Sequence, residues 1–265
     1  MKFLRERQRI ATVNLRICFP ELGDAEIQAL VTKHFESLGM SVFELAMAWW
    51  LSTKKIEKLI HLEGIENITG PLHEGRGVVL LSGHFASIEF PGRLLAHNLK
   101  SPAAMYQPMH NPMVDQIIRR GRRGTNVALI PKNDIRQMIR TLRNGQMVWY
   151  APDQSYSGKY SELVPFFSEP AMTNAALTHI ARISKACIVL AVPRRLENGG
   201  GYYTEIEPAL ENFPTDDPAA DALRVNQLLE EKIRLAPEQY YWIHRRFKNR
   251  PAPYPDPYNT ATDDH

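Results

Sequence analysis

The sequence predicts an α/β fold, in which a single domain has a central, mostly parallel sheet flanked by helices. Between about residues 59 and 210, short apolar or β-branched runs alternate with stretches of helical periodicity. This alternation is typical of strand–helix–strand units, whose strands run parallel. The chain of 265 residues, 44% hydrophobic and 23% charged, is long enough to bury a substantial core. Because no internal repeat or linker divides it, one domain over residues 1–265 is expected.

The segment 1–20 is predicted to be basic and membrane-proximal. Six cations, counting the amino terminus, stand against Glu6 in the opening "MKFLRERQRIATVNLR". Four apolar residues form a stripe on a short helix: Leu4, Ala11, Leu15 and Cys18. A basic amphipathic helix suits an anionic membrane surface, and it also occurs as a solvated helix at the end of a fold.

A long helix is expected over 25–51, where apolar residues recur at spacings of three and four. From Leu38 on, this helix is apolar nearly all round, and it ends in Trp49 and Trp50. A helix of this kind is either buried in a core or in contact with lipid. The sequence leaves both alternatives open.

The rest of the chain supplies the sheet and its flanking helices. Seven runs are predicted as strands: 59–63, 77–82, 103–107, 127–131, 147–151, 187–193 and 201–210. Four helical patterns lie between them: 88–97, 113–122, 134–143 and 174–184. Asn133 and Gly145 are expected to bracket the third of these helices. Residues 217–247 add one or two helices broken near Pro237, and the proline-rich segment 251–265 is expected to be disordered.

Composition argues against several classes of protein. A formal net charge of +3 is too small to indicate a nucleic-acid partner. The two cysteines, Cys18 and Cys187, are far apart and lack metal-type spacing, which favours reduced thiols over a disulfide framework. No uninterrupted apolar segment is long enough to span a bilayer, and the sequence shows no cleavable signal peptide.

The stretch "LLSGHFASIEF" at 80–90 carries the strongest sign of chemistry. Its histidine, His84, follows the predicted strand 77–82, and open α/β sheets place their ligands at the carboxyl ends of strands. A helix beginning around Ala86 would point its free N–H groups at the same crevice, as a site for a developing oxyanion. If His84 lies before this helix, it can fold back onto Glu89, which would fix its tautomer and leave the other ring nitrogen as a base. The pair is therefore predicted to act as a general base and its orienting carboxylate.

Other interpretations of this stretch stay open. A histidine near a carboxylate is often a satisfied structural group, and HxxxxE spacing occurs by chance. Ser82 or Ser87 as a nucleophile would lack the GxSxG turn that exposes such serines. A zinc site would need ligands at i, i+4 with further histidines or cysteines nearby, and this stretch has none.

Seven blocks of the sequence, in one order, are far more specific than HxxxxE alone. They are "IATVNLRICFPE", "FESLGMSVFELAMAWW", "GRGVVLLSGHFASIE", "YQPMHNPMVDQIIRRGR", "GQMVWYAPDQSYS", "VPFFSEPAMT" and "PEQYYWIHRRFKNRP". Through these blocks, the chain resembles the late acyltransferases of lipid A biosynthesis, the lauroyl/myristoyl type, within the HxxxxE glycerolipid acyltransferase group. The resemblance implies transfer of a fatty acyl group from acyl carrier protein, or less often coenzyme A, to a hydroxyl of a lipid A precursor. It implies no metal and no cofactor beyond the acyl donor.

The resemblance also implies roles for individual residues. His84 would take the proton of the acceptor hydroxyl, and Glu89 would orient His84 and stabilise its charged form. The acceptor carries phosphates and acidic sugars, so cations should bind it. These cations are implied to be Arg120, Arg122 and Lys132.

Four further polar residues receive roles from the resemblance. Asp153 and Gln154, after the predicted strand 147–151, occupy the place of an acidic substrate-binding motif, and a plain turn there is an equal alternative. Asn111 is a substrate-binding candidate that is also suited to cap its helix. His244, in "YYWIHRRF", is expected to be structural.

A location and partners follow from the same resemblance. Family members usually begin with a membrane-spanning helix before the arginine-rich stretch, and here Met1 falls almost where that helix would end. The expected location is the cytoplasmic face of the inner membrane, either peripheral or anchored by a segment absent from this chain. Expected partners are acyl carrier protein, a lipid A precursor or related lipid acceptor, and an anionic membrane surface, with no nucleic acid. Two alternatives stay open: an acyltransferase acting on another glycolipid or aminolipid, and a non-catalytic membrane-surface binding protein.

Overall fold

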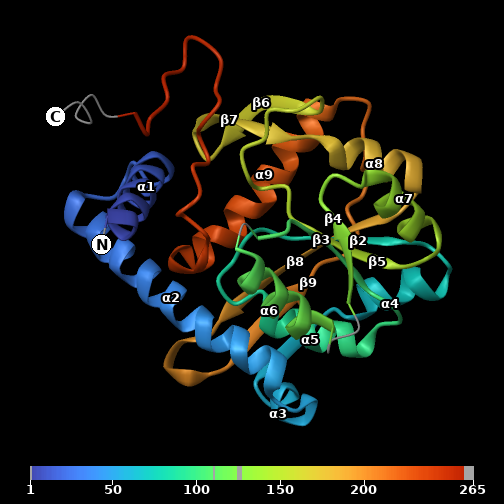
Figure 1. Cartoon of the computed structure of the whole chain (residues 1–265). Helices are drawn as coiled ribbons and strands as arrows, with labels where there is room; N and C mark the ends of the chain where they lie inside the picture. The colour runs from blue at the N-terminus through green and yellow to red at the C-terminus, as the bar shows by residue number, and fades with distance from the viewer. Residues whose placement is uncertain (1, 110, 124–126, 260–265) are drawn as a thin grey trace. The chain divides into compact units, whose positions relative to one another are not determined.

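The computed structural model describes residues 2–109, 111–123 and 127–259. The chain forms two compact units. Unit 1 comprises Met1–Leu38, Pro152–His179 and Pro214–His265, and unit 2 comprises Gly39–Ala151 and Ile180–Phe213. Figure 1 shows the elements of both. The expectation of one acyltransferase domain over 1–265 stays a prediction.

Unit 2 contains the predicted central sheet. In its described residues, seven strands pair in the order β1–β9–β8–β2–β5–β3–β4. Their bounds are β1 (Ile60–Glu63), β2 (Val78–Leu81), β3 (Ala103–Tyr106), β4 (Ala128–Pro131), β5 (Met147–Tyr150), β8 (Cys187–Arg195) and β9 (Tyr202–Ile206). All neighbours pair in parallel except β8 and β9, which pair antiparallel. The prediction of an α/β fold with a mostly parallel sheet flanked by helices is therefore confirmed.

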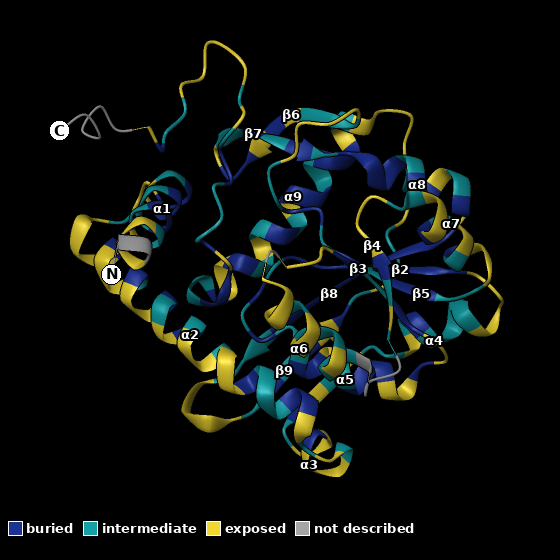
Figure 2. Cartoon of the chain, viewed as in Figure 1, coloured by how far each residue is buried: buried dark blue, intermediate teal, exposed yellow. Residues whose placement is uncertain are grey.

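Strand β2 lies inside this sheet, between β8 and β5. All of its residues are buried, as the dark blue of the central strands shows (Figure 2). A strand that is covered on both faces needs apolar side chains at every position, which explains its continuous apolar sequence. One buried cluster joins Val78, Leu80 and Val189 of the sheet to Ile68 and Leu95 of the helices.

Helices flank the strands of unit 2. They are α3 (Thr53–Glu57), α4 (Glu66–His73), α5 (Glu89–Asn98), α6 (Pro112–Arg123) and α7 (Ile135–Arg143), with a 3-10 turn η1 (Glu197–Gly199). Helices α2 (Asp24–Trp50) and α8 (Ala176–Ser184) each contain residues of both units. A second buried cluster packs Ala48 and Trp49 of α2 against Ile56 of α3 and Phe90 of α5. Ala48 and Trp49 near the end of α2 are thus buried, whereas Val42, Phe43 and Trp50 are exposed, so core burial accounts for one face of this part of the helix and lipid contact stays open for the other.

The cap of α7 differs from the prediction. Asp134, and not Asn133, accepts the N–H of Gln137 at 2.9 Å. Asparagine and aspartate are equally good N-caps, so the local sequence does not distinguish two such neighbours. Gly145 follows the helix with a φ of 68°, as a C-terminal stop requires.

Unit 1 contains an antiparallel hairpin covered by a helix. The hairpin consists of β6 (Ser161–Phe166) and β7 (Glu169–Asn174), and the helix is α9 (Pro218–Leu235). Val164, Ala175 and Ala222 form a buried cluster between them. The sequence does not predict this hairpin, because Pro165 and Pro170, which lie opposite each other, interrupt its pattern.

The predicted final helices end earlier than expected. Among the described residues after α9, only the short 3-10 turn η2 (Pro237–Gln239) is helical, so helix over the rest of 217–247 is wrong. The segment 240–247 is instead held by side chains. Arg246 is 2% exposed and donates to Met172 O at 2.9 Å and to Thr173 Oγ1 at 2.8 Å. These two hydrogen bonds attach the segment 240–247 to β7.

Helix α1 (Lys2–Cys18) packs inside unit 1. Three residues of its predicted apolar stripe, Ala11, Leu15 and Cys18, are buried. Arg7 donates to Ile243 O at 3.2 Å, and Arg9 donates to Tyr258 O at 2.8 Å. These three residues of the stripe and two of the basic residues thus serve internal packing, whereas Leu4 is 61% exposed. Contact of this segment with a membrane stays a prediction. Among the described residues, no helix has the length and apolar character needed to cross a bilayer.

The end of the chain is more ordered than predicted. Tyr258 is 1% exposed, and its hydroxyl accepts the N–H of Phe247 at 3.0 Å and bonds to Asn14 Oδ1. An aromatic anchor of this kind is invisible in a proline-rich composition, so disorder over the whole of 251–265 is wrong. Residues 260–265 lie outside the described residues.

Acid is expected to destabilise unit 1 through His34. This side chain is fully buried, and its Nδ1 lies 3.1 Å from Glu238 O. Burial lowers the pKa of His34 from 6.5 to about 4. Between pH 6.5 and pH 4, the unfolded chain therefore binds a proton at this histidine that the folded chain does not bind. The free energy of unfolding that is present above pH 6.5 falls by about 3 kcal/mol as the pH drops toward 4.

Urea unfolding at pH 7 and pH 4.5 measures this loss. His34→Gln keeps a donor for Glu238 O and does not titrate, so it should remove most of the difference. Equal pH dependence of the two proteins would assign the acid sensitivity to other groups.

Candidate active site

His84 stands just beyond the end of the central strand β2. The register pairs Leu81 with Tyr150 of β5 and with Leu190 of β8, and Ser82 N donates to Tyr150 O at 3.1 Å. The half-buried His84 follows two residues later. This is the carboxyl end of a parallel strand, where open α/β folds place ligands.

Helix α5 begins later than predicted. Its first residue is Glu89, and residues 86–88 form a turn instead of the helical start expected around Ala86. His84 is therefore outside the helix and Glu89 is in its first turn, as predicted. The His84 ring meets the ring of Trp149 on β5 edge to face, with centroids 6.1 Å apart and planes at 79°. That Glu89 orients His84 stays a prediction.

Arg122 of α6 binds the carboxylate of Glu89. Its Nε donates to Oε2 at 3.3 Å, and its Nη2 makes a closer contact with Oε1. Both side chains are 22% exposed. A two-point pair of this kind fixes the orientation of the carboxylate as well as its charge. Arg122, which the resemblance assigns to the acceptor, therefore forms an ion pair with Glu89, the residue predicted to orient His84.

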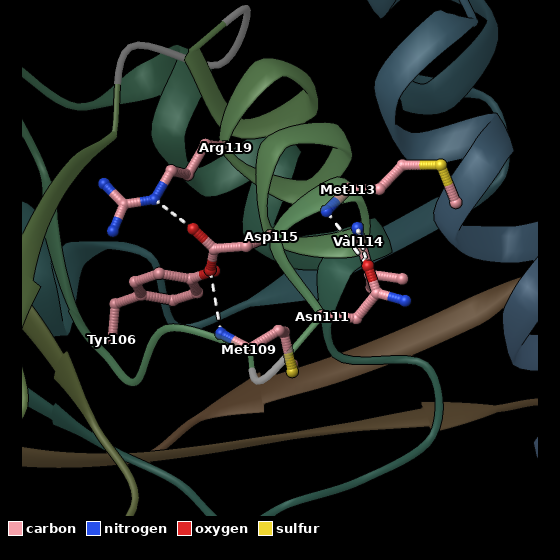
Figure 3. Close-up of polar contacts among 7 residues, drawn as sticks. All are labelled: Tyr106, Met109, Asn111, Met113, Val114, Asp115 and Arg119. Atoms are coloured by element: carbon pink, nitrogen blue, oxygen red, sulfur yellow. Dashed lines mark hydrogen bonds and ion pairs between the residues drawn. The ribbon is translucent and has the colours of Figure 1, made fainter.

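A group of polar contacts fixes α6 to the end of β3, and Figure 3 shows its members. Asp115 accepts from the hydroxyl of Tyr106, from Met109 N at 2.8 Å and from Arg119 Nε at 2.7 Å. The Tyr106 hydrogen bond, followed by that of Met109, lowers the pKa of Asp115. The Arg122 guanidinium lies 5.5 Å from the centroid of the Tyr106 ring. Asp115 thus helps to hold α6 where Arg122 reaches Glu89.

The remaining substrate-binding candidates of unit 2 lie on exposed surfaces. Asn111 caps α6, accepting from Met113 N at 3.0 Å (Figure 3). Arg120 is exposed on α6. Lys132 follows the edge strand β4 and donates to Gln107 Oε1 at 2.7 Å. Since β4 is three strands from β2, its end lies about 14 Å from that of β2.

Asp153 and Gln154 belong to unit 1. Asp153 is 2% exposed and accepts the hydroxyl of Tyr240 at 2.9 Å. Burial, then the charge of Asp153, raises the pKa of Tyr240. The next residue, Ser155, donates its N–H to His244 Nε2 at 3.3 Å. Asp153 and His244 therefore order this loop, and substrate binding by Asp153 or Gln154 stays a prediction.

An apolar cavity lies between α5 and the sheet in unit 2. Its space, counted together with the open solvent at its mouth, amounts to about 830 Å³. Its lining residues include Leu80, Gly92, Leu95, Ala96, Met147 and Ala191. Glu89, Arg122 and Trp149 line it as well, so it reaches the residues that contact or flank His84. Within the described residues, no three His, Cys, Asp or Glu side chains gather where they could hold a metal ion.

Residues 1–249 match the family model of bacterial lipid A biosynthesis acyltransferases. The chain belongs to this family. The acyltransferase is 37% identical over 260 residues to the lipid A biosynthesis lauroyltransferase of Escherichia coli strain K12, covering 97% of this chain and 84% of the relative. It is 38% identical over 255 residues to the lipid A biosynthesis palmitoleoyltransferase of the same strain, covering 94% and 81%. The resemblance stated from the seven sequence blocks is thereby confirmed, as is the acyltransferase class.

A solved structure is also similar to this acyltransferase. It is the 1-acyl-sn-glycerophosphate acyltransferase of Thermotoga maritima, at 14% identity and a TM-score of 0.42 over 89% of this chain and 99% of that chain. A likeness of this strength supports no conclusion about the site.

Sequence reasoning missed three residues that shape the site of this acyltransferase. Tyr106 and Asp115 fix α6, and Trp149 contacts His84. Asp115 carried one available signal, since Arg119 follows it by four residues and such pairs meet on one helix face. Trp149 carried none, because its pattern is that of any buried strand.

Proposed function

We propose that this acyltransferase moves a fatty acyl chain from acyl-acyl carrier protein to a hydroxyl of a lipid A precursor, at the cytoplasmic face of the inner membrane. The observation that supports this most is the apolar cavity whose lining includes Glu89, Arg122 and Trp149. An acyl chain in that cavity would present its thioester carbonyl beside His84. Family membership supports the lipid A precursor as the acceptor.

The chemistry needs a base but no covalent nucleophile. A thioester is already activated, so His84 need only accept the proton of the acceptor hydroxyl as its oxygen bonds to the carbonyl carbon. The tetrahedral intermediate then loses the carbon–sulfur bond, and His84 returns the proton to the departing thiolate. Negative charge develops on the carbonyl oxygen near the amino end of α5, whose dipole favours it. No metal or cofactor takes part in this proposal.

The acceptor headgroup would be bound by polar side chains, of which Arg120 and Lys132 are exposed. Arg120 and Lys132 remain proposed ligands of its phosphates, and Asp153 and Gln154 remain proposed ligands of its sugars. Cationic side chains pair with phosphate through charge-assisted hydrogen bonds, which makes Arg120 the strongest of these proposals.

Transfer by the purified protein tests the function. Acyl-acyl carrier protein and a lipid A precursor with free 3-hydroxyacyl chains should give a product heavier by one acyl group in mass spectrometry. Acyl-coenzyme A should be the poorer donor. Failure to acylate this precursor with donors of any chain length, while another glycolipid or aminolipid is acylated, would overturn the acceptor.

The length of the cavity is expected to limit the acyl chain. Glu89, Gly92 and Ala96 all line it along α5, and Ala96 lies about 10 Å from Glu89 along the helix axis. Ala96→Leu should therefore lower turnover of the longest accepted donor at least about tenfold. Turnover of a short donor, which does not reach Ala96, should be unchanged and serves as the control. Equal loss for all donor lengths would place the chain elsewhere.

A further inference from the structure

We propose that an exposed apolar surface of unit 2 inserts into the headgroup boundary of an anionic bilayer. This docking surface consists of six exposed side chains on α2 and α6: Val42, Phe43, Trp50, Met113, Val114 and Ile117. Their exposed fractions run from 39% to 73%. The inference rests on the proposed function and names the surface through which the enzyme reaches a lipid acceptor.

Helices α2 and α6 meet directly, so these side chains belong to one surface. A Cβ added at Gly121 of α6 would lie 2.1 Å from the indole of Trp49, which means that the α6 backbone touches this ring. Ile118 packs against the same buried cluster as Trp49 and Leu45.

The exposed apolar residues lie along α2 and α6, within about two turns of this contact. On α6, Ile117 and Met113 are one and two turns before Gly121, and residues four apart share a face. On α2, Val42 is two turns before Trp49, so it too extends from the contact. Phe43 and Trp50, two turns apart, form the adjoining stripe. Helical spacing therefore gathers these side chains around the α2–α6 contact, so they are not scattered singly.

Charge complementarity selects an anionic bilayer as the partner. Lys54 and Lys55 of α3 are exposed a few residues after Trp50. Arg120 is exposed on α6, three residues after Ile117. Among the acids nearby, Glu57 is exposed. Glu44 is buried, and its Oε1 lies 2.5 Å from Nε of Arg195. An apolar face with tryptophan, rimmed by cations, suits the boundary between headgroups and acyl chains.

The surface also lies next to the cavity. Trp49 contacts α6 at Gly121 and lines the apolar cavity that Glu89 and Arg122 share. A bilayer bound here would bring lipid acceptors close to this cavity.

Co-sedimentation with vesicles of phosphatidylglycerol and phosphatidylethanolamine tests the proposal. Phe43→Ser/Trp50→Ser/Ile117→Ser should weaken binding at least about tenfold, because binding scales with buried apolar area. Leu4→Ser/Leu235→Ser removes two side chains of unit 1 that are 61% and 60% exposed, and should not change binding. Arg120→Gln/Lys54→Gln/Lys55→Gln should weaken binding to these vesicles but not to neutral phosphatidylcholine vesicles.

Two further readouts separate this proposal from the proposed function. The triple serine variant should keep full acyl transfer to acceptor dispersed in detergent, and His84→Ala should keep vesicle binding. Unchanged vesicle binding by the triple variant would overturn the docking surface. The docking surface would also be overturned if the triple variant kept vesicle binding but lost acyl transfer from acyl carrier protein in detergent. The surface would then be assigned to binding of the carrier protein.

Discussion

Replacing His84 by alanine is expected to lower acyl transfer by about 10²–10⁴-fold, the contribution of a positioned general base. The fold should survive, because His84 lies beyond the end of β2 and is only half-buried. Glu89→Ala should lower transfer less, since Glu89 orients the base but does not take the substrate proton. Steady-state transfer from acyl-acyl carrier protein, together with thermal unfolding of each variant, measures both effects.

A matched control lies on the same helix as Glu89. His97→Ala removes an exposed histidine near the end of α5 and should leave transfer unchanged. If His84→Ala kept turnover near that of the unmodified enzyme, the proton would be taken by another group. If it lost both transfer and its cooperative unfolding, the conservative variant His84→Asn would show whether chemistry alone is affected.

Five of the seven strands of unit 2 could be predicted to within one residue at each end, for a physical reason, whereas the predicted ends of β8 and β9 are two and four residues off. Buried parallel strands need apolar side chains on both faces, so they stand out as continuous runs. The predicted strand 77–82 is Val78–Leu81 in the structure, and the predicted strand 147–151 is Met147–Tyr150. Each predicted end lies within one residue of the observed end.

Unit 1 could be predicted less well, because its elements depend on partners distant in sequence. The stripe of α1 was recognisable, but what it packs against was not. Arg9 and Asn14 meet Tyr258, which lies more than 240 residues away. No local pattern encodes such a pairing. A hairpin with prolines at both facing positions likewise lacks the alternation that identifies strands.

The same limit applies to the site. His84 and Glu89 could be found because both lie in one stretch at the end of one strand. The ion pair between Arg122 and Glu89 could not be predicted, since the two residues are 33 positions apart in the chain. That distance is closed by the packing of α6, which Asp115 and Tyr106 fix. Resemblance supplied Arg122 as a functional residue, and the structure supplies its contact.

Replacing Arg122 by methionine should therefore act on Glu89 and not mainly on the acceptor. Without the two-point pair, the carboxylate is free to turn, and a misplaced group beside the reacting atoms costs about 100-fold in rate. The expected loss is in kcat, with little change in the acceptor KM. Arg122→Lys should recover only part of it, because an ammonium is a point charge and cannot hold both oxygens. Arg120→Met, two residues away and exposed, is the matched control and should affect the acceptor KM instead.

A double-mutant cycle decides between the two roles. If Arg122 works through Glu89, Glu89→Ala/Arg122→Met should be little worse than the worse single variant, with a coupling energy of about 0.5–3 kcal/mol. If Arg122 binds acceptor phosphate on its own, the two losses should add and the acceptor KM should rise with kcat unchanged. The second outcome would contradict the positioning role. The ion pair would then be a resting arrangement that the acceptor replaces, since phosphate offers the same guanidinium the same two-point contact that Glu89 does.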